Sequence, residues 1–415
     1  MQAFQGKSSD ISLLFVTRVV RLLAYGSMSV VLVLYLDAVG VTEREIGVLL
    51  TMTLLGDTAI SLWITTAADR AGRRRMLILG AVLMAVGGIV FALTNSLVLL
   101  LAAATVGVLS PSGNEVGPFL AIEQAALAQN AASERRTGVF AWYHLSGSFA
   151  TAVGSLACGG AVGWLQARGV DPTDSYRTVF FAYAAAGVVL GVLFLRLSPA
   201  SEAPPADPEL TGRRLRFGLH RSRSVVLKLS ALFALDAFAG GFVLQSVIAY
   251  WFHVRFGADV QTLGGIFFGA NLLAGFSALA AARIARRFGL VNTMVWTHMP
   301  SNVLLILVPF MPTLSWAIGM LLLRFAISQM DVPARQSYTA AVVDPDERSA
   351  AAGVTGVART TGAALAPTFA GFLLANPALA GYPFVISGVL KLVYDGLLYR
   401  MFRRVRPPEE SGGRA

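Results

Sequence analysis

Basic and acidic side chains interrupt the long apolar runs of this sequence. An isolated charge at the centre of a bilayer costs at least about 2.5–3.5 kcal/mol, so each is expected to face an opposite charge or a water-filled cavity. Such groups can pair with one another, bind a charged solute or carry a proton. The basic ones are Arg18, Arg21, Arg324, Arg335, Arg359 and Lys391, and the acidic ones are Asp57, Glu115, Glu123, Asp236, Asp331 and Asp395.

Three side chains of the first apolar run share one helix face. Arg18, Arg21 and Tyr25 follow one another at spacings of three and four residues. Guanidinium groups bind carboxylates and phosphates through paired hydrogen bonds. We therefore expect this stripe to line a cavity and to bind substrate, and we expect Arg324 to contribute to the same binding.

Asp236 occupies the position in the second half of the chain that Arg21 occupies in the first. Gly26 matches Gly241 at the same offset. A charge on each of two equivalent helices indicates a site where the two halves of a duplicated protein face each other. We expect Arg21 and Asp236 to meet or to share solvent there, with Asp236 contributing to substrate binding. A static structural ion pair is the alternative.

Two apolar runs contain a break beside an acidic residue. Glu115 lies close to Pro118, and Asp331 lies close to Pro333. Proline removes a helix hydrogen bond, and discontinuous helices at transporter sites expose backbone polar groups to substrate or ion. We expect Glu115 to take part in substrate binding on this ground. The alternative is that each break acts only as a hinge and binds no ligand.

Two pairs of opposite charge lie four residues apart, Asp331 with Arg335 and Lys391 with Asp395. Residues at this spacing are neighbours on a helix surface. An ion pair within one helix is therefore the simplest expectation for each pair, and we favour a structural role for these four side chains.

Proton coupling requires a carboxylate whose protonation changes between two states of the protein, as burial and a movable cation allow. Asp57, Glu115 and Asp236 are the candidates. Asp57 has no basic neighbour in the sequence at helical spacing. A neutral, hydrogen-bonded Asp57 with no coupling role is the competing interpretation.

The elements that carry these charges are long and continuously apolar. Of 415 residues, 55% are hydrophobic and only 13% are charged, which is typical of an integral membrane protein. Continuous runs of this length favour helices over barrel strands. The fold class is an all-α membrane protein with twelve transmembrane helices. The runs are 12–36, 45–67, 76–94, 97–127, 138–164, 178–198, 226–252, 262–282, 290–312, 315–343, 350–375 and 382–402.

A polar, proline-rich and then basic stretch at 199–224 divides these runs into six and six. We predict an N-terminal six-helix bundle at 1–198, a cytoplasmic linker at 199–224, and a C-terminal six-helix bundle at 225–415 that ends in a basic tail. The net charge of +10 does not indicate nucleic acid, because most Lys and Arg gather in the termini and in alternate loops. This distribution places both termini in the cytoplasm.

The loop between the second and third runs carries a recognisable motif, formed by Gly56, Asp69, Arg70, Gly72, Arg73 and Arg74. On these residues the chain resembles the major facilitator superfamily of secondary transporters. Thr65 replaces the second glycine of the family motif. The resemblance implies two pseudo-symmetric six-helix bundles that alternate access to a central site, and it implies that the motif residues gate this change. The alternative for the arginines is that they only fix the membrane topology.

The function expected from these observations is secondary active transport of a small organic solute across the inner or plasma membrane, with proton coupling and with efflux favoured. The alternative is uptake or exchange of an organic anion, a carboxylate or phosphate ester, bound by intramembrane arginines. The single Cys158 and four scattered histidines indicate neither a disulfide nor a metal site. No cofactor and no enzymatic activity are expected, the partners are the solute, protons and the lipid bilayer, and the resemblance implies a monomer.

Overall fold

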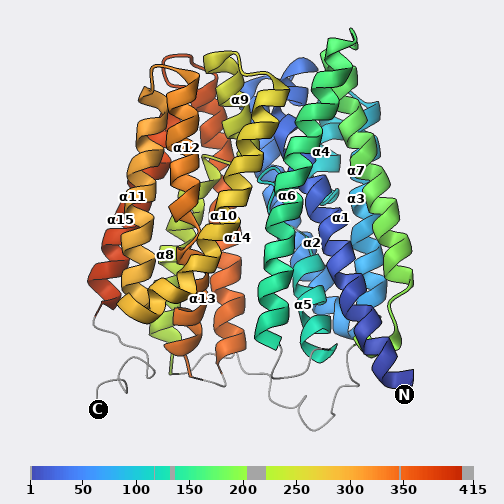
Figure 1. The fold of residues 1–415 in the computed structure, drawn as a ribbon, viewed down its shortest axis with the longest axis vertical. Coiled ribbons are helices and arrows are strands. Elements are labelled where there is room, and N and C mark those ends of the chain that lie inside the picture. The colour runs from blue at the N-terminus through green and yellow to red at the C-terminus, as the bar shows by residue number, and fades with distance from the viewer. Residues whose placement is uncertain (1, 116, 131–135, 203–220, 345–346, 404–415) are drawn as a thin grey trace. The chain divides into compact units, whose positions relative to one another are not determined.

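The computed structural model describes residues 2–115, 117–130, 136–202, 221–344 and 347–403. Every regular element in these ranges is a helix, and no strand occurs among them, so the predicted all-α class is confirmed (Figure 1). The first half contains α1 (Gln2–Ala38), α2 (Glu43–Ala71), α3 (Arg73–Leu93), α4 (Leu97–Val106), α5 (Phe119–Asn130), α6 (Arg136–Ala167), α7 (Pro172–Leu195) and the short 3-10 helix η2 (Pro199–Ser201).

In the second half, three of the six predicted spans are each divided into two helical elements. Its elements are α8 (Arg223–Gly241), α9 (Gln245–Phe256), α10 (Val260–Phe288), α11 (Leu290–Leu307), η4 (Val308–Phe310), α12 (Leu314–Ser328), α13 (Asp331–Ala341), α14 (Arg348–Leu374) and α15 (Tyr382–Phe402). Nine helical segments of the described chain are long and apolar enough to cross a membrane, counting α8–α9 and α12–α13 as one segment each. The broken α4–α5 segment, α14 and α15 occupy the remaining three of the twelve predicted spans.

Local sequence accounts for where several helices begin and end. Thr42 caps α2 with a capping box, in which its side chain accepts from the backbone N–H of Glu45 and the Glu45 carboxylate accepts from the backbone of Thr42. Asp171 caps α7, whose first residue is Pro172. Gly72 separates α2 from α3 at a φ of 101°, a conformation that favours glycine.

Contacts within the chain divide it into two compact units. Unit 1 comprises 1–205 together with 244–271, and unit 2 comprises 206–243 together with 272–415. The sequence repeat alone groups 244–271 with the second half of the chain. In the structure this segment, which contains α9 and the start of α10, belongs to unit 1.

Small residues bring the helices of unit 1 into close contact. An added Cβ at Gly26 of α1 would lie 2.2 Å from the carbonyl oxygen of Thr151 on α6, and one at Gly154 of α6 would lie 2.1 Å from the carbonyl oxygen of Leu23. Glycine at such a crossing lets two backbones approach, which is the usual way that membrane helices associate. These positions fix α6 along α1, as the two ribbons show (Figure 1).

Polar contacts hold α9 in unit 1. The Gln245 side chain donates to Ser29 Oγ at 2.8 Å, and the Ser246 N–H donates to the Pro111 carbonyl at 3.1 Å. Further along α9, the Tyr250 hydroxyl donates to Glu43 at 3.1 Å. The bond from Ser246 also gives a partner to a backbone N–H in the first turn of α9, where N–H groups have no partner within the helix.

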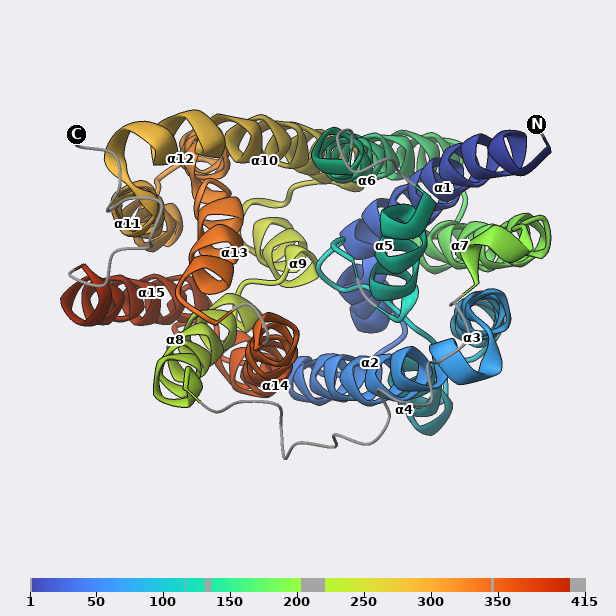
Figure 2. The ribbon, with the colours of Figure 1, turned by 90° about the horizontal axis from the view of Figure 1, so that it is seen from below.

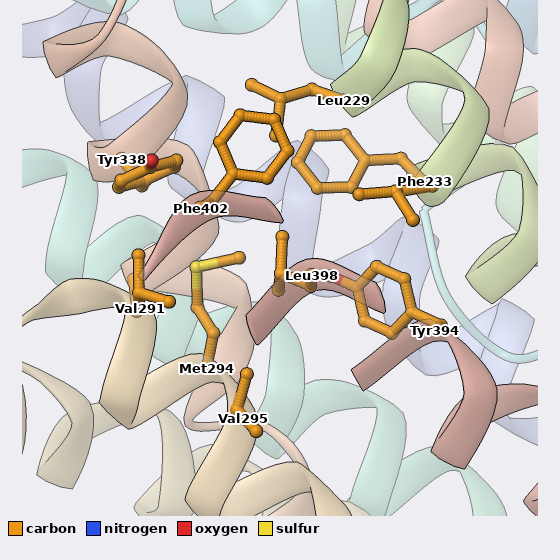
Figure 3. Packing of buried hydrophobic residues seen from close by; sticks show 11 residues of the cluster. Leu229, Phe233, Val291, Met294, Val295, Tyr338, Tyr394, Leu398 and Phe402 are labelled. Carbon is orange, nitrogen blue, oxygen red and sulfur yellow. The ribbon is translucent and has the colours of Figure 1, made fainter. Parts of the chain in front are cut away.

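An apolar cluster forms the core of unit 2. Its side chains come from α8, α11, α13 and α15, which are neighbours in the view from below (Figure 2). Phe233 of α8, Tyr338 of α13 and Phe402 of α15 converge with Met294 of α11 (Figure 3). Tyr394, at the edge of this cluster, borders the charged residues described below. The core therefore positions the helices that carry the charges of unit 2.

Candidate functional site

Arg21 of α1 forms the centre of a buried ion cluster in unit 1. Its side chain has no exposed surface. Nε donates to Glu115 Oε1 at 2.8 Å, Nη1 donates to Glu123 Oε1 at 2.9 Å and Nη2 donates to Glu123 Oε2 at 2.7 Å. One guanidinium therefore bridges two carboxylates, and the planar fork of arginine suits this arrangement.

Neighbouring side chains complete the cluster. Arg18 pairs with Glu115 Oε2 at 3.0 Å and lies over the ring of Tyr143 at 4.2 Å. Glu123 also accepts hydrogen bonds from the hydroxyls of Tyr143 and Thr17. The buried Glu123 carboxylate therefore accepts hydrogen bonds from three side chains, those of Arg21, Tyr143 and Thr17.

Arg21 and Asp236, which we expected to meet or to share solvent, each have ion-pair partners within their own unit. Arg21 finds its partners, Glu115 and Glu123, within unit 1, and Asp236 finds its own within unit 2. Glu115, which lies in the break between α4 and α5, contacts α1. Sequence reasoning counted Glu123 among the intramembrane charges but did not select it as a site residue, and it missed Tyr143.

The stripe of Arg18, Arg21 and Tyr25 does not face water in this conformation. Arg18 is 4% exposed and the other two are fully buried, so protein atoms surround the stripe in this structure, and its role in lining a cavity stays a prediction. Tyr25 stacks on Tyr183 with ring centroids 6.1 Å apart, and the Tyr183 hydroxyl donates to the Val108 carbonyl at 2.6 Å. The α4–α5 segment and α7 cover this face of α1.

The predicted break beside Glu115 is present between α4 and α5. Gly113 and Gly117 adopt positive φ angles of 68° and 77°, and Val108 does so at 50°. The freed N–H of Gly117 donates to Asp57 Oδ1 at 2.6 Å. Among the described residues, Asp57 forms no ion pair, so backbone and hydroxyl donors alone support this carboxylate.

Asp236 of α8 forms the centre of a second ion cluster, in unit 2. Its Oδ1 accepts from Lys391 Nζ at 2.6 Å and its Oδ2 accepts from Arg335 Nη1 at 3.0 Å. Arg335 also pairs with Asp331 at 3.4 Å, as its helical spacing predicts. The predicted pair of Lys391 with Asp395 is wrong, because Lys391 reaches across to α8 instead.

Asp395 of α15 is bound by side chains of α11. His298 Nδ1 lies 2.9 Å from Asp395 Oδ1, and the Asn302 amide donates to Asp395 Oδ2 at 2.9 Å. Sequence reasoning considered the histidines only as metal ligands and missed this contact. No local spacing could have found it, because residues of α11 and α15 are far apart in the chain.

Arg324 of α12 is a buried guanidinium that forms no ion pair within 4.0 Å among the described residues and lies over the Phe325 ring at 5.0 Å. It is 9% exposed, and its Nε has no hydrogen bond. The Nε of Arg359 on α14 also lacks a hydrogen bond. The ion cluster of unit 2 is therefore bordered by two basic side chains whose Nε atoms have no hydrogen-bond acceptor among the described residues.

The predicted gating motif lies at the junction of α2 and α3. The carboxylate of Glu202 accepts from the backbone N–H groups of Arg73 at 2.6 Å and Arg74 at 3.2 Å, so it caps α3. A Cβ at Gly56 would lie 1.9 Å from the Thr105 carbonyl oxygen, which makes glycine necessary at this crossing. The side chains of Asp69 and Arg70 lie outside the described residues.

Comparisons with known proteins agree on one family and one fold. Residues 14–330 match the model of the Major Facilitator Superfamily. The chain is 34% identical over 427 residues to the uncharacterized membrane protein YJR124C of Saccharomyces cerevisiae, and the match covers 96% of this chain and 95% of that protein.

Solved structures of transporters share the fold. A bacterial homolog of the human lysosomal transporter Spinster, inward-facing and unoccupied, matches with a TM-score of 0.74 and 15% identity over 95% of this chain and 96% of that one. The nucleoside transporter NupG matches with a TM-score of 0.70 and 14% identity over 95% of this chain and 99% of that one. The twelve-helix, two-bundle architecture of these transporters is the architecture of this chain.

Proposed function

The chain belongs to the major facilitator superfamily, and on this premise we propose that it moves a small organic solute across the cell membrane by alternating access, coupled to protons and in the export direction. In this proposal the protein works as a monomer in the inner or plasma membrane, with both termini in the cytoplasm. Arg18, Arg21, Tyr25, Glu115, Asp236 and Arg324 contribute to solute binding, and the loop from Asp69 to Arg74, together with Gly56, gates the conformational change.

The charge balance of unit 1 is the observation that carries the proton coupling. Three acidic side chains, Asp57, Glu115 and Glu123, share this region with only two basic ones, Arg18 and Arg21. Arg18 and Arg21 form ion pairs with the two glutamates, whereas Asp57 forms no ion pair among the described residues. In a low-dielectric surrounding an uncompensated carboxylate binds a proton readily. Asp57 can therefore take up a proton in one state and release it in another.

Replacement of Asp57 by Asn is expected to abolish gradient-driven transport and to retain solute exchange. Asn still accepts from the Gly117 N–H but cannot exchange a proton. The measurement compares accumulation in proteoliposomes, with and without a pH gradient, of a solute first identified by thermal-shift screening. Asp174→Asn is the matched control, because Asp174 is an exposed residue of α7. Equal gradient dependence in Asp57→Asn and wild type would remove Asp57 from the mechanism.

A second candidate is uptake or exchange of an organic anion, and Arg324 favours it. The basic side chains Arg324, Arg335, Arg359 and Lys391 outnumber the acidic Asp236, Asp331 and Asp395 in unit 2. A buried guanidinium with a free Nε is costly unless it gains an acceptor. The carboxylate of a bound solute would supply that acceptor.

Replacement of Arg324 by Gln is expected to weaken binding of acidic solutes selectively. A hydrogen bond to a charged group contributes about 1.5–3 kcal/mol, which corresponds to a loss of roughly tenfold to a hundredfold in affinity. Binding of benzoate and of its neutral analogue benzamide would be compared in wild type, Arg324→Gln and the control Arg255→Gln, a residue exposed on α9. An equal loss for both probes would count against the anion.

A further inference from the structure

His298 lies between two buried carboxylates of unit 2. It belongs to α11, and the carboxylates belong to α15 and α8. The side chain of His298 is 6% exposed and that of Asp395 is fully buried. The function proposed above assigns no role to His298 or to Asp395.

One ring nitrogen of His298 is fixed by Asp395. Nδ1 lies 2.9 Å from Asp395 Oδ1, and one hydrogen must lie between these two atoms. The Asn302 amide donates to the other oxygen of Asp395 and so fixes the plane of the carboxylate. The ring can therefore neither flip nor turn away without breaking this contact.

The other ring nitrogen faces Asp236. His298 Nε2 lies 4.0 Å from Asp236 Oδ1, the oxygen that also accepts from Lys391 at 2.6 Å. A lone pair on Nε2 would face the negative oxygen, whereas an N–H would be attracted to it. The geometry thus favours a second proton on the ring.

The charged groups around the ring are supplied by several helices. Lys391 and Asp395 come from α15 together with the ring of Tyr394, whose centroid lies 6.0 Å from that of His298. Asp236 comes from α8 and Arg335 from α13. Asp331 of α13 pairs with Arg335, and Arg324 of α12 and Arg359 of α14 are close enough to Asp236 to be attracted by it.

We propose that His298 is a proton-binding group of this transporter and that its protonation controls the partners of Asp236. A hydronium ion of the solvent gives its proton to the lone pair of Nε2, which leaves a water molecule and makes the ring cationic. The cationic ring then competes with Lys391 for Asp236 Oδ1. Lys391, once displaced, is free to bind the negative group of a solute. The inference rests on the proposed proton coupling, to which it adds a site in unit 2.

A purely structural role is the competing explanation. The bonds among His298, Asn302 and Asp395 would also hold α11 against α15 with a neutral ring. A structural role requires the hydrogen bond on Nδ1 and makes no use of Nε2. The protonation state of Nε2 therefore separates the two explanations.

The first test observes the ring directly and needs no solute. The chain contains four histidines, so protein labelled with ¹⁵N in the histidine rings and reconstituted in bilayers gives few signals in solid-state NMR. His298→Asn identifies the signal of His298. We expect its Nε2 to gain a proton as the pH is lowered, and we expect Asp395→Asn to remove that change. A ring that carries one proton at every pH at which the protein stays folded would overturn the proposal.

The second test measures coupling. His298→Asn retains a donor toward Asp395 but has no second nitrogen, so we expect it to retain solute exchange and to lose at least tenfold in gradient-driven accumulation of the screened solute. His253→Asn, on α9, is the matched control and is expected to behave as wild type. Full gradient dependence in His298→Asn would overturn the coupling role. If wild type shows no gradient dependence at all, the proposed proton-coupled function fails, and the NMR measurement alone decides whether His298 binds a proton.

Discussion

Replacement of Arg21 by Met is expected to lower the apparent free energy of unfolding by about 3–5 kcal/mol and to abolish transport. The reason is that Glu115 and Glu123 would lose their shared guanidinium while remaining buried. Met fills a similar length of apolar space, so the loss would come from the unpaired carboxylates. The measurement is unfolding of the purified protein in mixed micelles by increasing SDS.

Variants that restore the charge balance separate this effect from lost packing. Arg21→Met combined with Glu115→Gln and Glu123→Gln should recover most of the lost stability, because no unpaired charge remains, and should still fail to transport. Arg21→Lys should fall between wild type and Arg21→Met, since an ammonium group cannot bridge both carboxylates with a planar fork. Arg177→Met serves as the control at a partly exposed ion pair with Asp174, where about 1 kcal/mol or less is expected from the pair itself. A triple variant as unstable as Arg21→Met would refute the charge explanation.

Features of the fold that depend on local sequence could be predicted. The apolar runs marked the spans, and the proline and glycines around Glu115 marked the break between α4 and α5. Gly72, a residue of the motif, adopts a positive φ at the turn between α2 and α3. Each of these depends on residues within a few positions of one another, which the sequence states directly.

The partners of the buried charges could not be predicted in the same way. Lys391 and Asp395 share a helix face, and this spacing favoured an intrahelical pair. Helix packing instead brings Asp236 of α8 within 2.6 Å of Lys391 and His298 of α11 within 2.9 Å of Asp395. Which helices become neighbours is decided by close-packed glycines and by the whole core. A single sequence does not display those contacts.

The internal repeat identified equivalent positions in the two halves but gave no information about the ion-pair partners within each half. It matched Arg21 to Asp236 as equivalent positions in two related halves. Each then has partners in its own unit, Arg21 with two glutamates and Asp236 with two cations. The duplicated halves thus use the same position with opposite charge, and each half satisfies that charge by itself.

Removal of the Asp236 charge is the second change with a large expected effect. Asp236→Asn would leave the Lys391 ammonium without its carboxylate and would leave Arg335 with Asp331 alone. Breaking a buried pair in this way costs about 3–5 kcal/mol. We expect this fall in the apparent free energy of unfolding, measured by SDS titration, and a loss of transport, measured in proteoliposomes.

A double-mutant cycle identifies the partner. Lys391→Met alone should also destabilise, because it leaves Asp236 with less compensation, whereas Asp236→Asn with Lys391→Met should be more stable than the sum of the single changes predicts. The coupling between Asp236 and Lys391 is expected to exceed that between Lys391 and Asp395, the pair that helical spacing alone favours. A larger coupling for Lys391 with Asp395 would mean that the ammonium group belongs to its own helix, and the competition between Lys391 and His298 for Asp236 would then have no basis.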